Sequence, residues 1–96
     1  MEINLYNDNI IVTELQDDLK FNGTVVMYDS DSPYMFCKVE CVSVSAKDNG
    51  INPGEVLVIK RYAKEEYLPG TYFISYKDIR GSMSLDDYNE MKVEEN

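Results

Sequence analysis

Hydrophobic residues in this chain fall into short runs that are separated by turn-forming sequence. Several runs are rich in β-branched residues, and one of them, "CKVECVSVS", alternates apolar and polar positions, as a half-exposed strand does. The run "EVLVIKRY" is the most continuous, so we expect it to be the central strand. The predicted strands are residues 9–15, 24–28, 37–45, 55–62, 71–76 and 77–83.

Turn sequences follow most of these runs. "YDSDSPY", "KDNGINPG" and "LPG" combine Asp, Asn, Pro and Gly, the residues that turns favour. Helical spacing occurs only near the end of the chain, where Leu85, Tyr88 and Met91 are three residues apart. We therefore expect one all-β domain over residues 1–84, folded as a small barrel, and a frayed or weakly helical acidic tail over residues 85–96.

Length and charge limit the possible functions. The chain has 96 residues, the size of one domain, and carries a net charge of −9 with no histidine. Phosphate contacts need clustered Lys and Arg, so the charge argues against nucleic acid or an anionic membrane as a direct ligand. The start "MEINLYNDN" does not have the pattern of a signal peptide, and no apolar run is long enough to span a membrane. The expected location is the cytoplasm.

The sequence offers little catalytic chemistry. Without histidine there is no Ser–His or Cys–His pair, and no phosphate-binding glycine motif occurs. Cys37 and Cys41 would lie on one face of a strand about 13 Å apart, which is too far for a disulfide or a shared metal. Asp29 and Asp31 only partly match a calcium loop. We expect no enzyme activity, no bound metal and no cofactor.

Five motifs in order resemble the co-chaperonins of the GroES type, over most of residues 4–81. The family's opening pattern is matched by Asp8 and "IIV", although Leu5 and Asn9 replace its Pro and Arg. Its two strand glycines are likewise replaced, by Cys37 and Ser43. The five matching segments are "LYNDNIIV", "GTVVM", "CKVECVS", "PGEVLVIKRY" and "TYFISYKDI".

One departure from the family narrows the resemblance. The segment "AKDNGIN" leaves no room for the roof hairpin that the family usually carries at this point. The shortening is similar to co-chaperonins encoded by some bacteriophages, which act with the host's chaperonin in capsid protein folding. The resemblance thus implies a GroES-like β-barrel with the roof hairpin shortened or absent, working in virion assembly in the host cytoplasm.

The resemblance also gives a role to "GTVVM". In the family a mobile loop, here residues 14–28, docks an apolar tripeptide on a GroEL-type chaperonin, which itself binds the ATP. The tripeptide would be Thr24–Val26 or Val25–Met27, because two registers fit. The alternative is that residues 24–28 form an ordinary buried strand. The implied chaperonin-binding residues are Gly23, Thr24, Val25, Val26 and Met27.

The family's last strand pairs with the first strand of a neighbouring subunit in a homoheptameric ring. By resemblance, "DIRGSM" would pair with "INLYND", and the ring would enclose an unfolded client protein. The alternative is that "DIRGSM" pairs within its own chain. The implied interface residues are Ile3, Leu5, Tyr6, Asp78, Ile79 and Met83.

Two other functions fit the charge and size. An acidic β protein could mimic nucleic acid, or act as an interaction module, against a host protein. It could also decorate a capsid. Neither alternative accounts for an ordered series of co-chaperonin motifs around a charged loop with an apolar tip. The acidity itself would give the cage a polar negative wall, or would serve only solubility.

Overall fold

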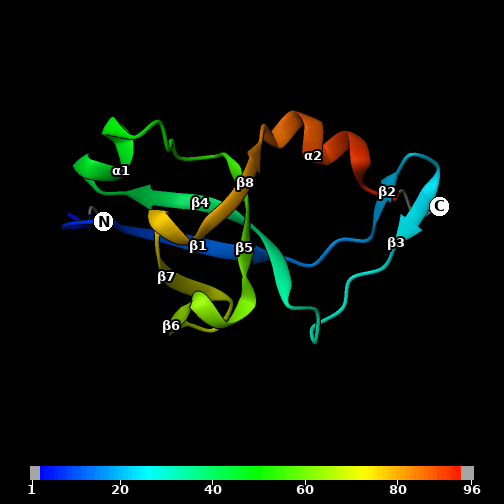
Figure 1. Ribbon diagram of the computed structural model, residues 1–96, viewed down its shortest axis with the longest axis horizontal. Helices are drawn as coiled ribbons and strands as arrows, with labels where there is room; N and C mark the ends of the chain where they lie inside the picture. Colours follow the sequence, from blue (N-terminus) through cyan, green and yellow to red (C-terminus); the bar gives the residue numbers. More distant parts are fainter. Residues whose placement is uncertain (1–2, 94–96) are drawn as a thin grey trace.

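A six-stranded antiparallel sheet forms the body of the protein in a computed structural model, which describes residues 3–93 (Figure 1). The strand order is β6-β7-β1-β4-β5-β8. A second, two-stranded sheet pairs β2 with β3 at the far end of the molecule from α1. The strands are β1 (Asn9–Leu15), β2 (Leu19–Phe21), β3 (Thr24–Val26), β4 (Tyr34–Val42), β5 (Val56–Lys60), β6 (Glu65–Leu68), β7 (Thr71–Ser75) and β8 (Ile79–Met83). The helices are α1 (Val44–Asp48), the short 3-10 turns η1 (Arg61–Ala63) and η2 (Tyr76–Asp78), and α2 (Leu85–Met91).

The main core lies on one face of the large sheet. Strand alternation places every second residue of β1, β4 and β5 on this face, where the side chains are almost fully buried. Its buried members are Ile10, Val12, Met35, Cys37, Val39, Leu57, Ile59 and Ile74.

Strand β5 is not the central strand, so that prediction is wrong. The central pair is β1 and β4, and β5 lies one strand from the edge. The apolar run of β5 is continuous because both faces of the strand are buried, not because the strand is central. Leu57 and Ile59 face the main core, whereas Val56 belongs to a second cluster with Leu19 and Tyr88. An unbroken hydrophobic run indicates a strand covered on both sides, and here α2 supplies the second cover.

The C-terminal segment is better ordered than predicted. Residues 85–91 form α2, and the Ser84 side chain caps it by accepting a hydrogen bond from the Asp87 amide at 3.1 Å. Asp86 and Asp87 lie in the first turn, where the helix dipole favours negative charge. Tyr88 is fully buried. Of the two expected states of the tail, frayed or weakly helical, residues 85–91 take the helical one, and residues 94–96 lie outside the described part.

A bulge in β4 alters the predicted placement of the cysteines. Ile11 pairs with Cys41 but Val12 pairs with Val39, so β4 has one extra residue, Glu40, at this point. Beyond the bulge Val42, rather than Cys41, packs against the main core. Cys37 is buried and Cys41 is half-buried, and both are free thiols. The prediction that they share one face fails because of the bulge.

The connection from β4 to β5 begins with α1 rather than with a longer strand. Ser43 ends the strand, and its hydroxyl donates to the Asn7 carbonyl at 2.7 Å and accepts from the Ala46 amide at 3.1 Å. These bonds satisfy a buried hydroxyl and start the helix at Val44. The strand predicted to reach residue 45 therefore stops at Val42.

The sheet has two edges, β6 and β8. Within residues 3–93 no strand ladder joins them, so the hydrogen-bonded sheet is open rather than a closed barrel. Strand β8 pairs with β5 of its own chain, which is the intramolecular pairing that the sequence left as an alternative. Its other edge carries no partner in the described chain. No helix of residues 3–93 has the length and apolar character to cross a membrane.

We predict that Leu57→Ala lowers the free energy of unfolding by about 2–5 kcal/mol, because it leaves a cavity in the main core. The control Val44→Ala removes methyl groups from a side chain that is 75 % exposed. It should change stability by less than about 0.5 kcal/mol. Urea unfolding followed by circular dichroism measures both. Similar losses in the two variants would contradict the assigned core.

Candidate functional site

The segment predicted to be a mobile loop, residues 14–28, contains the β2–β3 hairpin. Asn22 and Gly23 form its two-residue turn, with φ angles of 49° and 84°. Positive φ at both turn positions suits Asn-Gly and matches the twist of a hairpin. The ladder pairs Leu19 with Val26, Lys20 with Val25 and Phe21 with Thr24. The hairpin lies at the opposite end of the molecule from α1 (Figure 1).

The end of β3 presents three consecutive apolar side chains to solvent. Val25 and Val26 are each 51 % exposed, and Met27 is 71 % exposed. In a strand packed on the core, the alternation of side chains between the two faces would bury either Val25 or Val26, but neither is buried. The alternative interpretation was right that residues 24–26 form a strand and wrong that the strand is buried. We call Val25, Val26 and Met27 the apolar tip.

The other strand of the hairpin is anchored to the body. Leu19 is only 3 % exposed and packs with Val56 and Tyr88. The Phe21 ring stacks on Phe36 of β4 at a centroid distance of 6.4 Å. The hairpin therefore has one strand fixed against the domain and one strand that carries the exposed tip.

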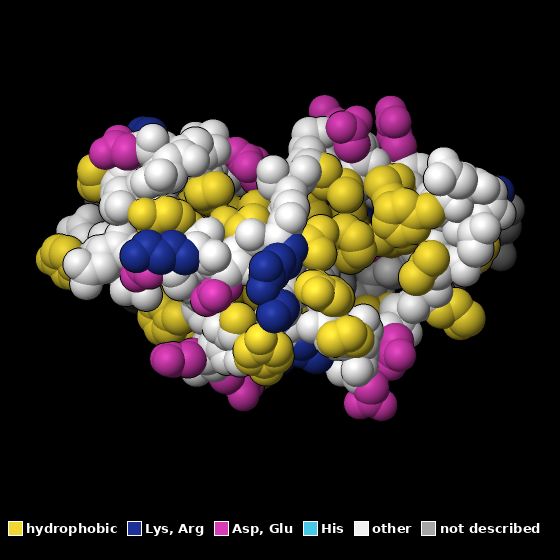
Figure 2. Space-filling view, in the orientation of Figure 1, with side chains coloured by type: hydrophobic (Ala, Val, Ile, Leu, Met, Phe, Trp, Pro, Cys, Tyr) yellow, Lys and Arg dark blue, Asp and Glu magenta, His cyan; other side chains and the backbone are white. Residues whose placement is uncertain are grey.

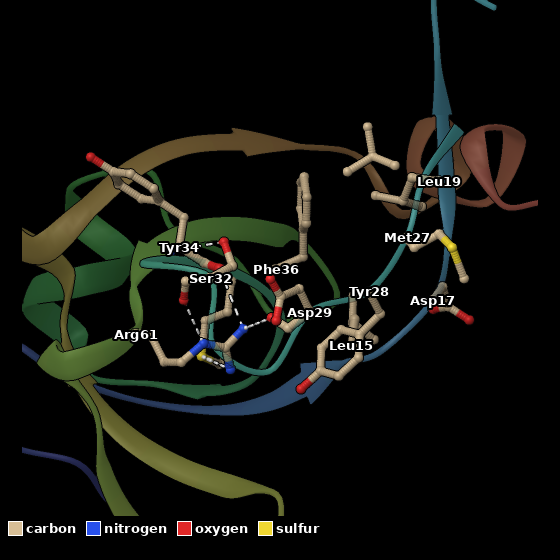
Figure 3. A pocket seen from close by; sticks show the side chains of 12 residues that line it. Leu15, Asp17, Leu19, Met27, Tyr28, Asp29, Ser32, Tyr34, Phe36 and Arg61 are labelled. Atoms are coloured by element: carbon tan, nitrogen blue, oxygen red, sulfur yellow. Dashed lines mark hydrogen bonds between the residues drawn. The ribbon is translucent and has the colours of Figure 1, made fainter. Parts of the chain in front are cut away.

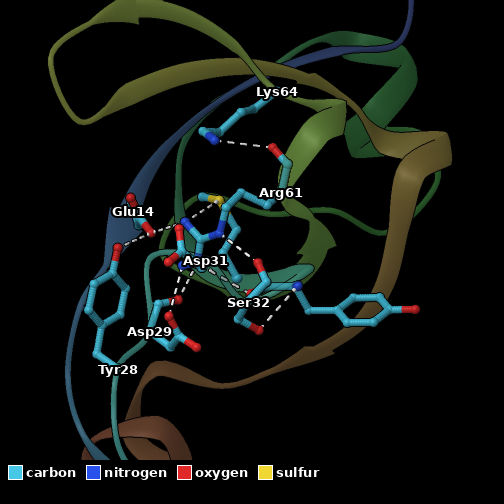
Figure 4. A network of polar contacts seen from close by, with 9 residues as sticks. Glu14, Tyr28, Asp29, Asp31, Ser32, Arg61 and Lys64 are labelled. Atoms are coloured by element: carbon cyan, nitrogen blue, oxygen red, sulfur yellow. Dashed lines mark hydrogen bonds and ion pairs between the residues drawn. The ribbon is translucent and has the colours of Figure 1, made fainter.

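A polar network joins the end of β1, at Glu14, to residues 28–32, where the chain returns to the sheet (Figure 4). We call this junction the neck. The Arg61 Nη1 donates to Glu14 Oε2 at 2.6 Å, and the Tyr28 hydroxyl donates to the same oxygen at 2.7 Å. The Arg61 Nε donates to the Ser32 carbonyl at 2.8 Å, and the Arg61 Nη2 donates to the Asp29 carbonyl at 3.2 Å. One guanidinium thus joins the departing strand to the returning segment. This network was not predicted from the sequence, because its residues are far apart along the chain.

The network controls the ionisation of Glu14, whose side chain is only 6 % exposed. Burial by itself would raise the pKa of this carboxyl. The hydrogen bonds from Arg61 and Tyr28 outweigh burial and lower the pKa below its usual 4.5. Glu14 is therefore ionised at neutral pH and ties the neck together as an anion.

A groove of about 250 Å³ runs between the hairpin and β4 (Figure 3). Its lining is mostly apolar, and Arg61 lies at one end. In the space-filling view, hydrophobic side chains gather beside α2 and between the hairpin and the sheet (Figure 2). The lining residues are Leu15, Asp17, Leu19, Val26, Met27, Tyr28, Asp29, Ser32, Tyr34, Met35, Phe36 and Arg61. Among residues 3–93 no cluster of three or more potential metal ligands occurs.

The predicted interface residues fall into two separate groups. Ile3, Leu5 and Tyr6 line a hollow together with Val42 and Val44, and Tyr6 is 74 % exposed. Asp78 is exposed at the end of η2, whereas Ile79 packs against the main core and Met83 against the second cluster. Ile79 and Met83 therefore already contribute to the packing of their own chain.

Comparison with known proteins gives no relative: no protein-family model, no curated protein and no solved structure matches this chain. The motif resemblance and the geometry of the hairpin are thus the basis for any functional proposal.

We predict that Arg61→Gln raises the pKa of Glu14 relative to the wild type, because it removes the charge and the hydrogen bond of the guanidinium while the burial of the carboxyl remains. In the wild type the pKa of Glu14 is lower in the folded protein than in the unfolded chain, so Glu14 stabilises the fold above about pH 4.5. This contribution is lost as the pH falls through the pKa of Glu14 in the folded protein. In the variant the pKa of Glu14 lies closer to its unfolded value, so the Glu14 contribution to stability should be smaller. NMR titration of the Glu14 side-chain carbon measures the pKa directly.

A matched control is Lys38→Gln, which removes a looser ion pair to Glu40, 3.9 Å long and more than a third exposed on both sides. It should leave the Glu14 titration unchanged. An unaltered Glu14 pKa in Arg61→Gln would show that the guanidinium does not hold the neck.

Proposed function

We propose that this chain is a co-chaperonin that caps a GroEL-type chaperonin ring during its ATP cycle. The observation that carries the proposal is the apolar tip, three consecutive exposed hydrophobic side chains at the end of a hairpin that projects from the body. A soluble domain gains nothing for its own stability from such a tip, so a partner is its natural explanation. The order of the five co-chaperonin motifs supports a GroEL-type chaperonin as that partner.

The energetics of the tip suit a lid that binds and releases. Val25 and Val26 are already about half covered, so burying the rest contributes roughly 1 kcal/mol each, and Met27 somewhat more. One hairpin would therefore bind weakly. Several hairpins in one ring bind together through their high effective concentration, and the complex still opens when the chaperonin changes state.

The sheet edges support assembly into a ring. Edge strand β6 carries Glu65 and Glu66, charges that discourage pairing with another chain. Edge strand β8, "IRGSM", has one charge and one glycine, and its outer edge has no partner in residues 3–93. We infer that β8 pairs there with residues 3–8 of a neighbouring copy in a homoheptamer, and that the open six-stranded sheet corresponds to a GroES-like barrel that is not closed between β6 and β8.

The proposed client is an unfolded protein inside the closed cage. A viral capsid protein is favoured, because the roof hairpin is shortened or absent, as in some bacteriophage co-chaperonins. The net charge of −9 per chain would give the cage a negative, polar lining. Such a wall offers an unfolded apolar chain few contacts and repels acidic ones. The ATP would be bound by the chaperonin and not by this chain.

The test is sedimentation velocity of the protein alone and with a purified bacterial chaperonin in ATP, in ADP and without nucleotide. The proposal predicts a heptamer that co-sediments with the chaperonin only when nucleotide is present. The double variant Val25→Ser/Val26→Ser should remain heptameric and lose more than about 100-fold in affinity, because a small loss per hairpin multiplies over the ring.

Leu68→Ser is the matched control, because Leu68 is 57 % exposed but lies on β6, away from the hairpin. It should bind like the wild type. A monomer or dimer that ignores the chaperonin in every nucleotide state would contradict the proposal. In that case binding to a basic host protein, the acidic-mimic alternative, becomes the hypothesis to test.

A further inference from the structure

The C-terminal helix touches the hairpin at the point where it leaves the body. The Tyr88 hydroxyl donates to Asp17 Oδ2 at 2.9 Å, and the Val93 amide donates to the Asp18 carbonyl at 3.0 Å. Lys92 forms an isolated antiparallel bridge with Leu19. In Figure 1, α2 runs from the end of β8 toward β2. Segments more than 70 residues apart in sequence thus lie side by side.

Apolar packing reinforces these polar links. The Tyr88 ring lies 5.7 Å from the Phe36 ring between centroids, and Phe36 in turn stacks on Phe21 of β2. Leu19 is buried against Tyr88 and Val56. The first strand of the hairpin therefore rests on a surface that α2 completes.

Asp18 connects this contact to the returning arm of the hairpin. Its carboxylate accepts a hydrogen bond from the Tyr28 amide at 2.7 Å, while its backbone carbonyl accepts the bond from Val93. One residue thus joins the helix end, the departing arm and the returning arm. The Arg61 network holds the neck closer to the sheet, and this second set of contacts holds the hairpin itself.

We propose that α2 with Lys92 and Val93 is a clamp that positions the hairpin, and that Tyr88 is its central positioning residue. Releasing the clamp leaves the hairpin attached to the body through its neck but free to swing and to open its short ladder. A three-pair ladder is too small to persist without support from the body. The clamp therefore determines how far the hairpin is already folded before a partner binds.

The effect of the clamp on capping rests on the proposed function. A hairpin that is already ordered loses less conformational freedom on binding than an unstructured loop does. The clamp should therefore raise the affinity of each tip for the chaperonin without touching the chaperonin. The helix, which lies outside the co-chaperonin motifs, then gains a role in that function.

The experiment is amide hydrogen exchange in the intact protein, compared between wild type, Tyr88→Phe and Asp17→Ala. Tyr88→Phe keeps the ring and removes only the hydroxyl, so the fold should be retained. Both variants should speed exchange at residues 19–26 by about tenfold or more, the size expected of one lost hydrogen bond to a carboxylate. Exchange in β1 and β4 should stay as in the wild type.

Tyr62→Phe is the matched control, because Tyr62 is 78 % exposed and its hydroxyl accepts a bond from Lys60 at 3.0 Å, away from the hairpin. It should leave exchange at residues 19–26 unchanged. Unchanged hairpin exchange in both Tyr88→Phe and Asp17→Ala overturns the clamp. An equal rise across β1, β4 and the hairpin also overturns it, because the helix would then support the whole fold and not the hairpin.

Sedimentation with the chaperonin separates this inference from the proposed function. If the wild type caps the chaperonin, Tyr88→Phe should cap it more weakly, whereas Tyr62→Phe should cap it normally. Equal capping by both variants overturns the role of the clamp in binding. If the wild type does not bind, the proposed function fails, and the exchange data still decide whether α2 positions the hairpin.

Discussion

The ion pair between Arg61 and Glu14 is the constraint on which the candidate site depends. Strands β1 and β4 are paired in the sheet, and the chain between them, residues 16–33, departs and returns at the same end. Ordering a connection of this length costs conformational entropy, which the contacts that hold it must offset. The partly buried guanidinium donates to Glu14 and to carbonyls of the returning segment, so the two sides of the neck are joined and the Glu14 charge is compensated.

The hairpin beyond this neck has one strand packed on the body and one strand exposed to solvent. Leu19 and Phe21 of β2 pack on the body, whereas Val25 and Val26 of β3 stay half exposed. The supporting surface comes from β4, β5 and α2, which explains why β5 is apolar on both faces. An exposed apolar tip is therefore presented by an anchored element, which lowers the ordering cost of binding it.

The sequence predicted those parts of the fold that depend on local pattern. The strands at 9–15, 71–75 and 79–83 follow from β-branched runs and turns, whereas the exposed tip was expected only through the co-chaperonin resemblance. Long-range features were not predictable. The Arg61–Glu14 contact spans 47 residues, and the burial of Tyr88 depends on a surface built by five strands. The bulge at Glu40 likewise has no local signature, and it reversed the expected placement of Cys41.

The most direct test of the account is hydrogen exchange of the wild-type protein with and without a GroEL-type chaperonin and nucleotide. Amides of residues 23–27 should become protected in the complex, while those of β1 and β4 should not change. Protection confined to other surfaces, or none in any nucleotide state, would contradict the central claim that the apolar tip is the binding element.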